Sequence, residues 1–251
     1  MANHLEGKVA VVTGASRGLG RAMSVAFAAA GGKVALVARD AAKLAETAAL
    51  CNAAGGEGVA FEANVAVEAD VQRIEKEIMA KFGRIDILVN NAGINIRKNI
   101  DEFTLAEWTL LMDTNVTSAF LMSRACVPHM KGKGWGRIIN MTSIMSHVSL
   151  GGRSAYSSSK AALLGMTKAL AMELAPEGIT VVGISPGPFA TEMNTALMEN
   201  PELNKQFLQK IPIGKWGQPE DMGTLAAFLC SDAANFITGT DILIDGGWCA
   251  Q

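Results

Sequence analysis

The sequence predicts an α/β fold: a parallel sheet covered on both faces by helices, in one domain spanning residues 1–251. Three observations predict it. Short β-branched runs alternate with helical patterns six times, no repeat or low-complexity linker interrupts them, and the first strand runs into a glycine-rich turn that opens a helix. Parallel strands need crossover connections, which helices usually supply. A chain of 251 residues can bury one core of this kind.

The amino-acid composition and net charge indicate which kinds of partner the chain can bind. The chain is 49% hydrophobic and carries a formal net charge of -2, without a lysine and arginine cluster that would attract nucleic acid or a membrane surface. Its four cysteines are scattered and form no metal or redox pair. Met1 to Lys8 has no apolar leader segment, so the cytoplasm is the expected location. Small molecules and copies of this chain are the expected partners.

The first strand and helix enclose a glycine turn. Lys8 to Thr13 reads as a strand and Leu19 to Ala30 as a helix, with Thr13-Gly14-Ala15-Ser16-Arg17-Gly18-Leu19-Gly20 between them. Glycines allow close backbone approach, and a helix N-terminus offers free N–H groups to an anion. The turn therefore suits the pyrophosphate of a dinucleotide in a Rossmann-like fold, although an ordinary tight turn stays open.

The second strand, Lys33 to Ala38, ends at the position that faces the adenosine ribose in such folds. Arg39 stands there, and Arg17 can reach it from the glycine turn. Arginine favours a 2′-phosphate, so we expect NADP(H) rather than NAD(H). Asp40 is the competing carboxylate, but its place before a helix over Ala41 to Ala54 favours an N-cap.

The middle of the chain supplies two more strands. Gly58 to Glu62 reads as the third strand, followed by an amphipathic helix over Glu68 to Phe82. Ile85 to Val89 is the fourth strand and ends in Asn90-Asn91-Ala92-Gly93. Small and amide residues suit a backbone that lies against a flat ligand, and an ordinary βα loop is the alternative.

A long helical region from Leu105 to Met130 contains Asn115. An asparagine is unfavourable inside an apolar helix unless its side chain holds a local kink or a water. Arg137 to Thr142 is the fifth strand, and Ser143 follows it. Ligands in open parallel sheets bind beyond the carboxyl ends of the strands, so Ser143 stands where chemistry is expected.

Tyr156 and Lys160 lie four residues apart at the start of a helix that runs to about Ala175. At this spacing their side chains share one helix face. A free phenol has a pKa of about 10, and a nearby ammonium can lower it toward neutrality. The pair therefore suits proton transfer, and a half-buried tyrosine beside a surface lysine is the alternative.

The last part of the chain resumes the pattern. Ile179 to Ile184 is the sixth strand, and 185–188 breaks it with two prolines and a glycine. The segment Phe189 to Trp216 has no strand pattern and reads either as a mobile lid over a substrate or as a surface helix pair. Pro219 to Cys230 is a last helix and Asp241 to Asp245 a last strand.

Five motifs in this order resemble the short-chain dehydrogenase/reductases in their single-domain form, over Gly7 to Gly247. They are TGxxxGxG at Thr13 to Gly20, NNAG at Asn90 to Gly93, Ser143, YxxxK at Tyr156 to Lys160, and the turn Pro186-Gly187. The resemblance implies a Rossmann-like three-layer fold and a nicotinamide-dependent dehydrogenase or reductase acting on CH-OH groups.

The resemblance also implies catalytic roles. Tyr156 would be the general acid in carbonyl reduction and the base in alcohol oxidation, with Ser143 bonded to the same substrate oxygen. Lys160 would bind the nicotinamide ribose and lower the pKa of the tyrosine, and Asn115 would anchor a water that links Lys160 to solvent.

By the same resemblance, three groups of residues would bind the cofactor. They are Gly14, Ser16, Arg17, Gly18 and Leu19 at the pyrophosphate and adenosine, Asn91, Ala92 and Gly93 beside the adenosine and ribose, and Pro186, Gly187 and Thr191 beside the nicotinamide. The chain departs from the family at Asn64-Val65, where aspartate before valine is usual. An amide can also bond adenine, so contact there is still expected.

The substrate is less determined. If Asn95, Arg97, His147 or Arg153 faces the cleft, a hydroxylated or carboxylated substrate is favoured, whereas solvated loop residues would say nothing. Phe189, the first residue of the expected lid, is a further candidate for substrate contact. The loop after Gly93 resembles that of gluconate 5-dehydrogenase-type members, which favours a keto-sugar acid or polyol. A 3-oxoacyl thioester reductase and a non-catalytic NADP(H)-binding sensor are the alternatives.

Self-association is also expected. The helices over Asp113 to Met130 and Ala155 to Ala175 carry apolar residues around much of their circumference. Family members commonly pair these helices, which implies a homodimer or homotetramer. The segment Gly246 to Cys249 is a candidate for a second interface.

Overall fold

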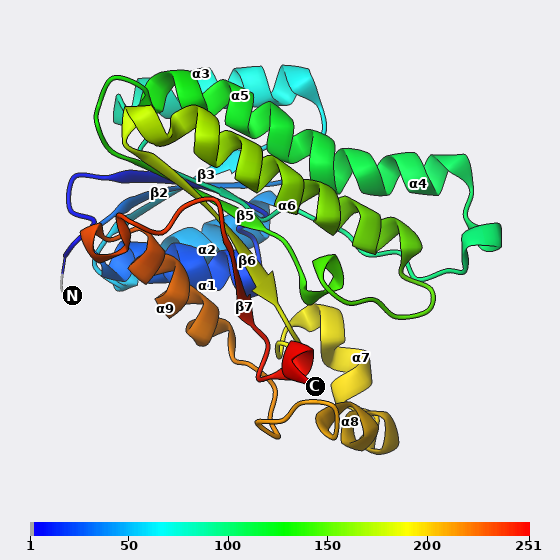
Figure 1. Cartoon of the computed structure of the whole chain (residues 1–251). Helices are drawn as coiled ribbons and strands as arrows, with labels where there is room; N and C mark the ends of the chain where they lie inside the picture. The colour runs from blue at the N-terminus through cyan, green and yellow to red at the C-terminus, as the bar shows by residue number, and fades with distance from the viewer. Residues whose placement is uncertain (1–2) are drawn as a thin grey trace.

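The computed structural model describes residues 3–251, apart from the side chains of residues 193 and 196. Its centre is a seven-stranded parallel sheet of order β3-β2-β1-β4-β5-β6-β7 (Figure 1). The strands are β1 (Val9–Thr13), β2 (Lys33–Ala38), β3 (Glu57–Glu62), β4 (Ile87–Asn90), β5 (Gly136–Met141), β6 (Ile179–Pro186) and β7 (Asp241–Ile244). Every strand predicted from the sequence is present, and the doubly wound α/β fold is confirmed.

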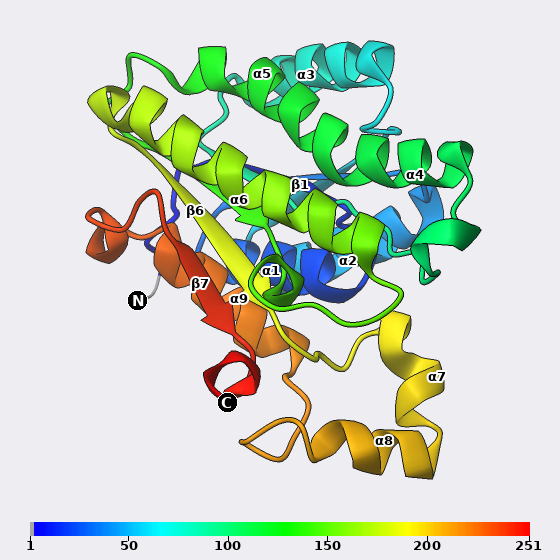
Figure 2. The same ribbon diagram turned by 45° about the vertical axis from the view of Figure 1, so that its right-hand side comes forward.

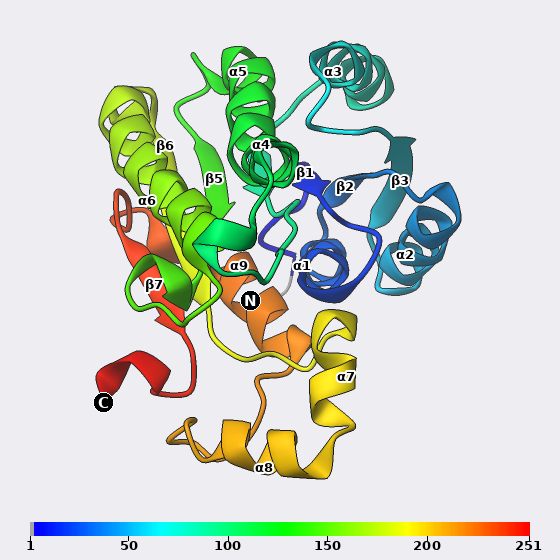
Figure 3. The same ribbon diagram turned by 90° about the vertical axis from the view of Figure 1, so that its right-hand side faces the viewer.

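Helices cover both faces of this sheet (Figures 1 and 3). One face carries α1 (Gly18–Ala29), α2 (Ala41–Ala53) and α9 (Pro219–Leu229), and the other carries α3 (Glu68–Phe82), α4 (Leu105–Met112), α5 (Ser118–Met130) and α6 (Ser154–Leu174). Two separate apolar clusters fill the layers. One packs Phe27, Leu44 and Met222 on the sheet, and the other packs Ile74, Met122 and Leu174 on it. The strands are buried on both faces, which explains their continuous apolar runs.

The direction of winding reverses between β1 and β4, which pair in parallel although two strands, β2 and β3, separate them in sequence order. The connections that follow β1 and β4 therefore leave on opposite faces and open a crevice at the carboxyl ends of the strands. The glycine turn after β1 and the residues after β4 meet at this crevice.

The long helical region predicted over Leu105 to Met130 is divided. A π-helical turn over Asp113–Thr117 separates α4 from α5, and the buried Asn115 lies at its centre. π-Turns widen the helix locally and release backbone groups. The asparagine thus marks a real distortion of the helix, as the sequence indicated.

The segment between β6 and α9 contains two short helices, α7 (Thr195–Met198) and α8 (Pro201–Leu208), which project beyond the sheet (Figure 2). Phe207 of α8 stacks on Trp216 with ring centroids 5.1 Å apart, and it contacts Trp248 at the same distance. Trp248 thus contacts Phe207 within its own chain, and the second interface expected for the segment Gly246 to Cys249 stays a prediction.

β6 continues through Pro186, beyond the break expected at Ser185. Proline is tolerated there because it occupies the last position of the strand, and Gly187 N takes over the next bond, to Ile244 O at 2.9 Å. No helix within residues 3–251 is long and apolar enough to cross a bilayer.

Candidate active site

The glycine turn is fastened to the end of β4. Asn91 Nδ2 donates to Thr13 O at 2.8 Å and to Gly14 O at 3.2 Å, while Thr13 Oγ1 accepts from the main-chain N–H groups of Asn91 and Ala92. A Cβ built on Gly20 would lie 2.3 Å from Gly14 O and 2.5 Å from Asn91 Nδ2. Only glycine fits there, so the backbone forms a cradle that a pyrophosphate can approach.

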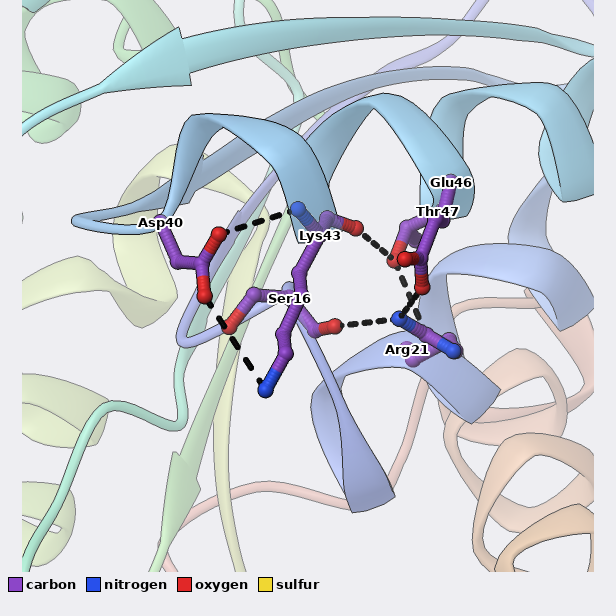
Figure 4. Close-up of polar contacts among 6 residues, drawn as sticks. All are labelled: Ser16, Arg21, Asp40, Lys43, Glu46 and Thr47. Atoms are coloured by element: carbon purple, nitrogen blue, oxygen red, sulfur yellow. Dashed lines mark hydrogen bonds and ion pairs between the residues drawn. The ribbon is translucent and has the colours of Figure 1, made fainter.

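Arg21, on the first turn of α1, holds this cradle against α2 (Figure 4). Its guanidinium donates to Ser16 O at 2.6 Å, to Thr47 Oγ1 at 3.0 Å and to Glu46 Oε2 at 2.9 Å. A fork of donors in one plane fixes the carbonyl of Ser16 relative to both helices. Arg21 therefore orders the loop.

Three cations border the crevice after β2. Arg17, Arg39 and Lys43 line the cavity there together with Asp40. The Asp40 carboxylate is turned to its own helix, because Oδ1 accepts from Lys43 N at 3.0 Å and Oδ2 lies 3.9 Å from Lys43 Nζ (Figure 4). This confirms the predicted N-cap. The excess of positive charge suits a phosphate better than a ribose hydroxyl.

The catalytic candidates meet on the other side of the crevice. Tyr156 and Lys160 lie on the first turns of α6, and Ser143 follows β5, where its Oγ accepts from Met145 N at 3.1 Å. Ser143 and Tyr156 both line the cavity, and Ser143 is close enough to lower the pKa of the Tyr156 phenol. Lys160 Nζ lies 5.7 Å from the Tyr156 ring centroid and donates to Met141 O at 2.6 Å. A substrate oxygen between Ser143 and Tyr156 would meet two hydroxyl donors.

Burial shifts the pKa values of both Tyr156 and Lys160. Burial raises the pKa of Tyr156, while Ser143 and the charge of Arg153 lower it by less. Arg153 is the cation that lowers the pKa of Tyr156, and burial lowers the pKa of Lys160 itself to about 8. Desolvation outweighs the positive neighbours in this structure, and the expected effect of Lys160 on the phenol stays a prediction. A protonated phenol is the form that donates to a carbonyl oxygen.

Asn115 supports the site from behind. Its Oδ1 accepts from Ile94 N at 2.7 Å, and its Nδ2 donates to Ile94 O and Ser159 Oγ, each at 3.0 Å. The loop after β4 and helix α6 are thus tied to the π-turn. Asn115 does not line the cavity, so its predicted role in a water chain stays a prediction.

Two arginines converge beside Tyr156. Arg97 and Arg153 both line the cavity, and burial and then the charge of Arg97 lower the pKa of Arg153. Within residues 3–251 neither guanidinium has a carboxylate partner at ion-pair distance. Asn95 lines the same wall, and its buried Oδ1 has no hydrogen-bond partner in the part of the chain described. This wall can bind an anion and a hydroxyl group.

These groups share one cavity of about 710 Å³, which is large enough for a cofactor and a small substrate. The structure places the following predicted residues in its lining: Gly14, Ser16, Arg17, Gly18, Leu19, Arg39, Asn64, Val65, Asn91, Ala92, Gly93, Asn95, Arg97, Ser143, Arg153, Tyr156, Lys160, Pro186, Gly187, Phe189 and Thr191. Asn64 Oδ1 accepts from Ala66 N at 3.2 Å, which leaves the amide NH₂ for adenine.

His147 is the substrate candidate that the structure does not bring into the cavity. Its Nε2 lies 2.6 Å from Asp241 Oδ2 instead. Lys43 and Trp248 also line the cavity, and neither was predicted there. Lys43 carried a usable signal, because it lies one helical turn after Arg39 and Asp40. Trp248 carried none, since the approach of the C-terminal segment to α8 is a tertiary contact.

A crevice at the switch point of a doubly wound sheet, with a glycine cradle on one side and Ser143 and Tyr156 on the other, defines a dinucleotide-dependent oxidoreductase. The chain belongs to the short-chain dehydrogenase/reductase family. A family model described as Enoyl-(Acyl carrier protein) reductase matches residues 14–249.

Relatives of two kinds cover nearly the whole chain. A 3-oxoacyl-[acyl-carrier-protein] reductase from Synechocystis sp. is 41% identical over 97% of both chains. A candidate gluconate dehydrogenase from Agrobacterium tumefaciens has a similar crystal structure, with a TM-score of 0.95, 34% identity and all of both chains covered. A candidate NAD(P)-dependent gluconate 5-dehydrogenase from Beutenbergia cavernae, with NADP bound at low occupancy, gives a TM-score of 0.92 and 37% identity over 98% of both chains.

Proposed function

We propose that this protein transfers a hydride between NADP(H) and the carbonyl or secondary alcohol of a small hydroxylated acid, of the keto-sugar acid class. The nicotinamide supplies or accepts the hydride. Tyr156 donates the proton to the carbonyl oxygen in reduction and accepts it in oxidation, and Ser143 hydrogen-bonds the same oxygen. Lys160 binds the nicotinamide ribose from the same helix face as Tyr156.

The observation that carries the substrate class is the pair Arg97 and Arg153. Arg153 is half-buried and Arg97 is exposed, and their like charges repel across the wall. An anion that binds between them offsets this repulsion. A carboxylate accepts two parallel hydrogen bonds from a guanidinium. The buried Asn95 Oδ1 can accept from a substrate hydroxyl, as a polyhydroxy acid requires. The gluconate-type names of two structural relatives support the same class.

We propose NADP(H) over NAD(H) on the charges after β2. Arg17, Arg39 and Lys43 border the ribose end of the cavity, and Asp40 is engaged as the cap of α2. The NADP bound in the Beutenbergia cavernae relative supports this choice. A carboxylate free to accept from the ribose would have supported NAD(H).

A 3-oxoacyl thioester is the second candidate substrate. The reductase from Synechocystis sp. supports it by name, and the reaction would use the same Ser143 and Tyr156. The long apolar acyl chain would then face Leu150, Leu197 and Phe207, which line the cavity together with the arginines. A cofactor-binding sensor without turnover is the remote alternative.

The deciding experiment follows the absorbance of NADPH and NADH with keto-sugar acids, 3-oxoacyl thioesters, 2-enoyl thioesters and neutral ketoses. We expect turnover of a keto-sugar acid with NADPH. Arg97→Met should raise its KM about tenfold to a hundredfold, as the loss of a charged hydrogen bond implies, and should leave the KM of a neutral ketose unchanged. The control is Arg73→Met, on the exposed face of α3, which should change neither.

Other outcomes would redirect the assignment. Preferred turnover of a 3-oxoacyl thioester, with no effect of Arg97→Met, would select the second substrate class. Turnover of the enoyl thioester alone would contradict a carbonyl reaction. Tight binding of NADPH without turnover of any compound would support the sensor.

We also propose that residues 189–216 act as a lid and that the protein self-associates. Phe207 and Trp248 already close one side of the cavity. Phe120 of α5 and Met172 of α6 expose 49% and 80% of their surface, which suits a helix-pairing interface. Light scattering that finds only a species of 26.3 kDa would contradict the association.

A further inference from the structure

A buried carboxylate lies behind the wall of the cavity. Asp241 is the first residue of β7, and its side chain is 4% exposed. Its Oδ1 accepts from Thr142 Oγ1 at 2.6 Å, and its Oδ2 accepts from Ser185 Oγ and lies next to His147 Nε2, each at 2.6 Å. Asp241 itself does not line the cavity. Burying a carboxylate is costly unless its oxygens are bonded, and here both are.

Each of the three partners of Asp241 is close in sequence to a residue that lines the catalytic cavity. Thr142 immediately precedes Ser143, and Ser185 immediately precedes Pro186. His147 follows the short 3₁₀ helix Ile144–Ser146, whose N-cap is Ser143. The Asp241 carboxylate therefore binds both ends of the segment 142–147, which carries Ser143. Through Ser185 it also binds the end of β6, which leads to the expected nicotinamide wall.

The neighbouring strand β6 has a glycine where the Asp241 carboxylate lies against it. Gly183 of β6 is the register partner of Asp241, and a Cβ built on Gly183 would lie 2.1 Å from Asp241 Oδ1. No side chain fits at that distance, so the Asp241 side chain occupies the space above the glycine. Thr142 Oγ1 and Ser185 Oγ also lie 3.0 Å apart, which closes the cluster.

We propose that Asp241 is a positioning residue for the reaction. Through Thr142 and His147 it fixes the Ser143 hydroxyl, and through Ser185 it fixes Pro186, so that the substrate oxygen and the nicotinamide ring keep their spacing. This inference rests on the role of Ser143 in the proposed function. Catalysis is sensitive to such spacing, because a displacement of about 1 Å can cost about a hundredfold in rate.

The test compares Asp241→Ala and Asp241→Asn with a matched control at the opposite end of the sheet. Asp86 is equally buried, at 1% exposure, and its Oδ2 accepts from Val9 N at 2.9 Å and from Arg84. Both sites hold a fully bonded carboxylate, but only Asp241 is linked to Ser143. Asp86→Asn therefore measures the general effect of losing a buried carboxylate.

We expect Asp241→Ala to lower kcat about tenfold to a hundredfold and to leave the KM for NADPH within about twofold. Asp241→Asn keeps the size of the side chain and should lose less. His147→Ala, at a partly exposed side chain, should lower kcat even if both Asp241 variants fail to fold. Asp86→Asn should lower the melting temperature without this drop in kcat. Unchanged kcat in Asp241→Ala, or an equal drop in Asp86→Asn, would overturn the inference.

Amide hydrogen exchange supplies a readout that needs no substrate. Exchange in residues 143–148 should accelerate in Asp241→Ala and stay normal in residues 9–13, and Asp86→Asn should show the reverse pattern. If the wild type turned over none of the substrates, the proposed function would fail, and exchange alone would then decide whether Asp241 orders the Ser143 segment. Normal exchange of 143–148 in Asp241→Ala would contradict it.

Discussion

The ammonium of Lys160 donates a hydrogen bond to the carbonyl oxygen of Met141 at 2.6 Å. Met141 is the last residue of β5 and precedes Ser143 by two residues. Helix α6 therefore contributes more than Tyr156 to the site, because its lysine is bonded to the strand that delivers the serine. The two elements that carry the catalytic candidates are locked together by a charged hydrogen bond in a buried place.

Tyr156→Phe should abolish turnover while the Kd for NADPH changes by less than about twofold. Only the proton carrier is lost, and the ring that packs against the cavity remains. General acid catalysis contributes about a hundredfold to ten-thousandfold, so kcat should fall by at least that factor. Steady-state kinetics and fluorescence titration with NADPH measure the two quantities. A variant that kept most of its activity would refute Tyr156 as the acid.

The depressed pKa of Lys160 makes stability depend on pH with a defined sign. Burial lowers this pKa from 10.5 to about 8. Between these values the unfolded chain holds a proton that the native lysine has released, so the lysine's share of the free energy of unfolding rises as pH increases from about 8 to 10.5. The full rise is about 3 kcal/mol.

Denaturant unfolding at several pH values in this window would measure that rise. Lys160→Met serves as the comparison, because this variant keeps the cysteines and Tyr156 and lacks only the lysine. We expect the difference, wild type minus variant, to increase with pH. Parallel stability curves for the two proteins would show that the native lysine titrates normally.

Arg39→Ala should raise the KM for NADPH about tenfold to a hundredfold, since a charged hydrogen bond to phosphate is lost, and should change the KM for NADH by less than about twofold. Lys43→Met should act in the same direction with a smaller effect. Lys33→Met, at the other end of β2, is the control and should affect neither cofactor. Equal losses for both cofactors would locate the phosphate elsewhere.

Asn115→Ala should lower the free energy of unfolding by about 2 kcal/mol as well as reduce turnover. The variant leaves the buried main chain of Ile94 without its side-chain partners at the π-turn. Asn99→Ala removes an exposed cap of the 3₁₀ helix Ile100–Glu102 and should cost about 1 kcal/mol without changing kcat. Thermal unfolding and initial rates distinguish the two. Full stability in Asn115→Ala would contradict this account of the π-turn.

The sheet could be predicted because each strand is a short apolar run between turn signals, and buried parallel strands need nothing else. The glycine cradle and the Tyr156 and Lys160 pair were also predictable, since their geometry is local to one turn or one helix. Asp40 followed from capping rules and was found as predicted. Short-range geometry decides the cradle, the pair and the cap.

The remaining features depend on groups far apart in the chain. Trp248 reaches the cavity through Phe207, and His147 turns to Asp241, which lies 94 positions later. No periodicity encodes either contact. The sign of the Tyr156 pKa shift depends on how much water the fold excludes, whereas spacing shows only that a lysine is near.

The 2.1 Å contact that a Cβ at Gly183 would make with Asp241 Oδ1 couples the residue choices at these two positions. A side chain at 183 would displace the carboxylate from Thr142, so the bonded aspartate at 241 depends on the glycine at 183. The two positions should therefore covary across neighbouring strands. In a library randomised at both positions, alanine at 183 should survive only with a smaller residue at 241.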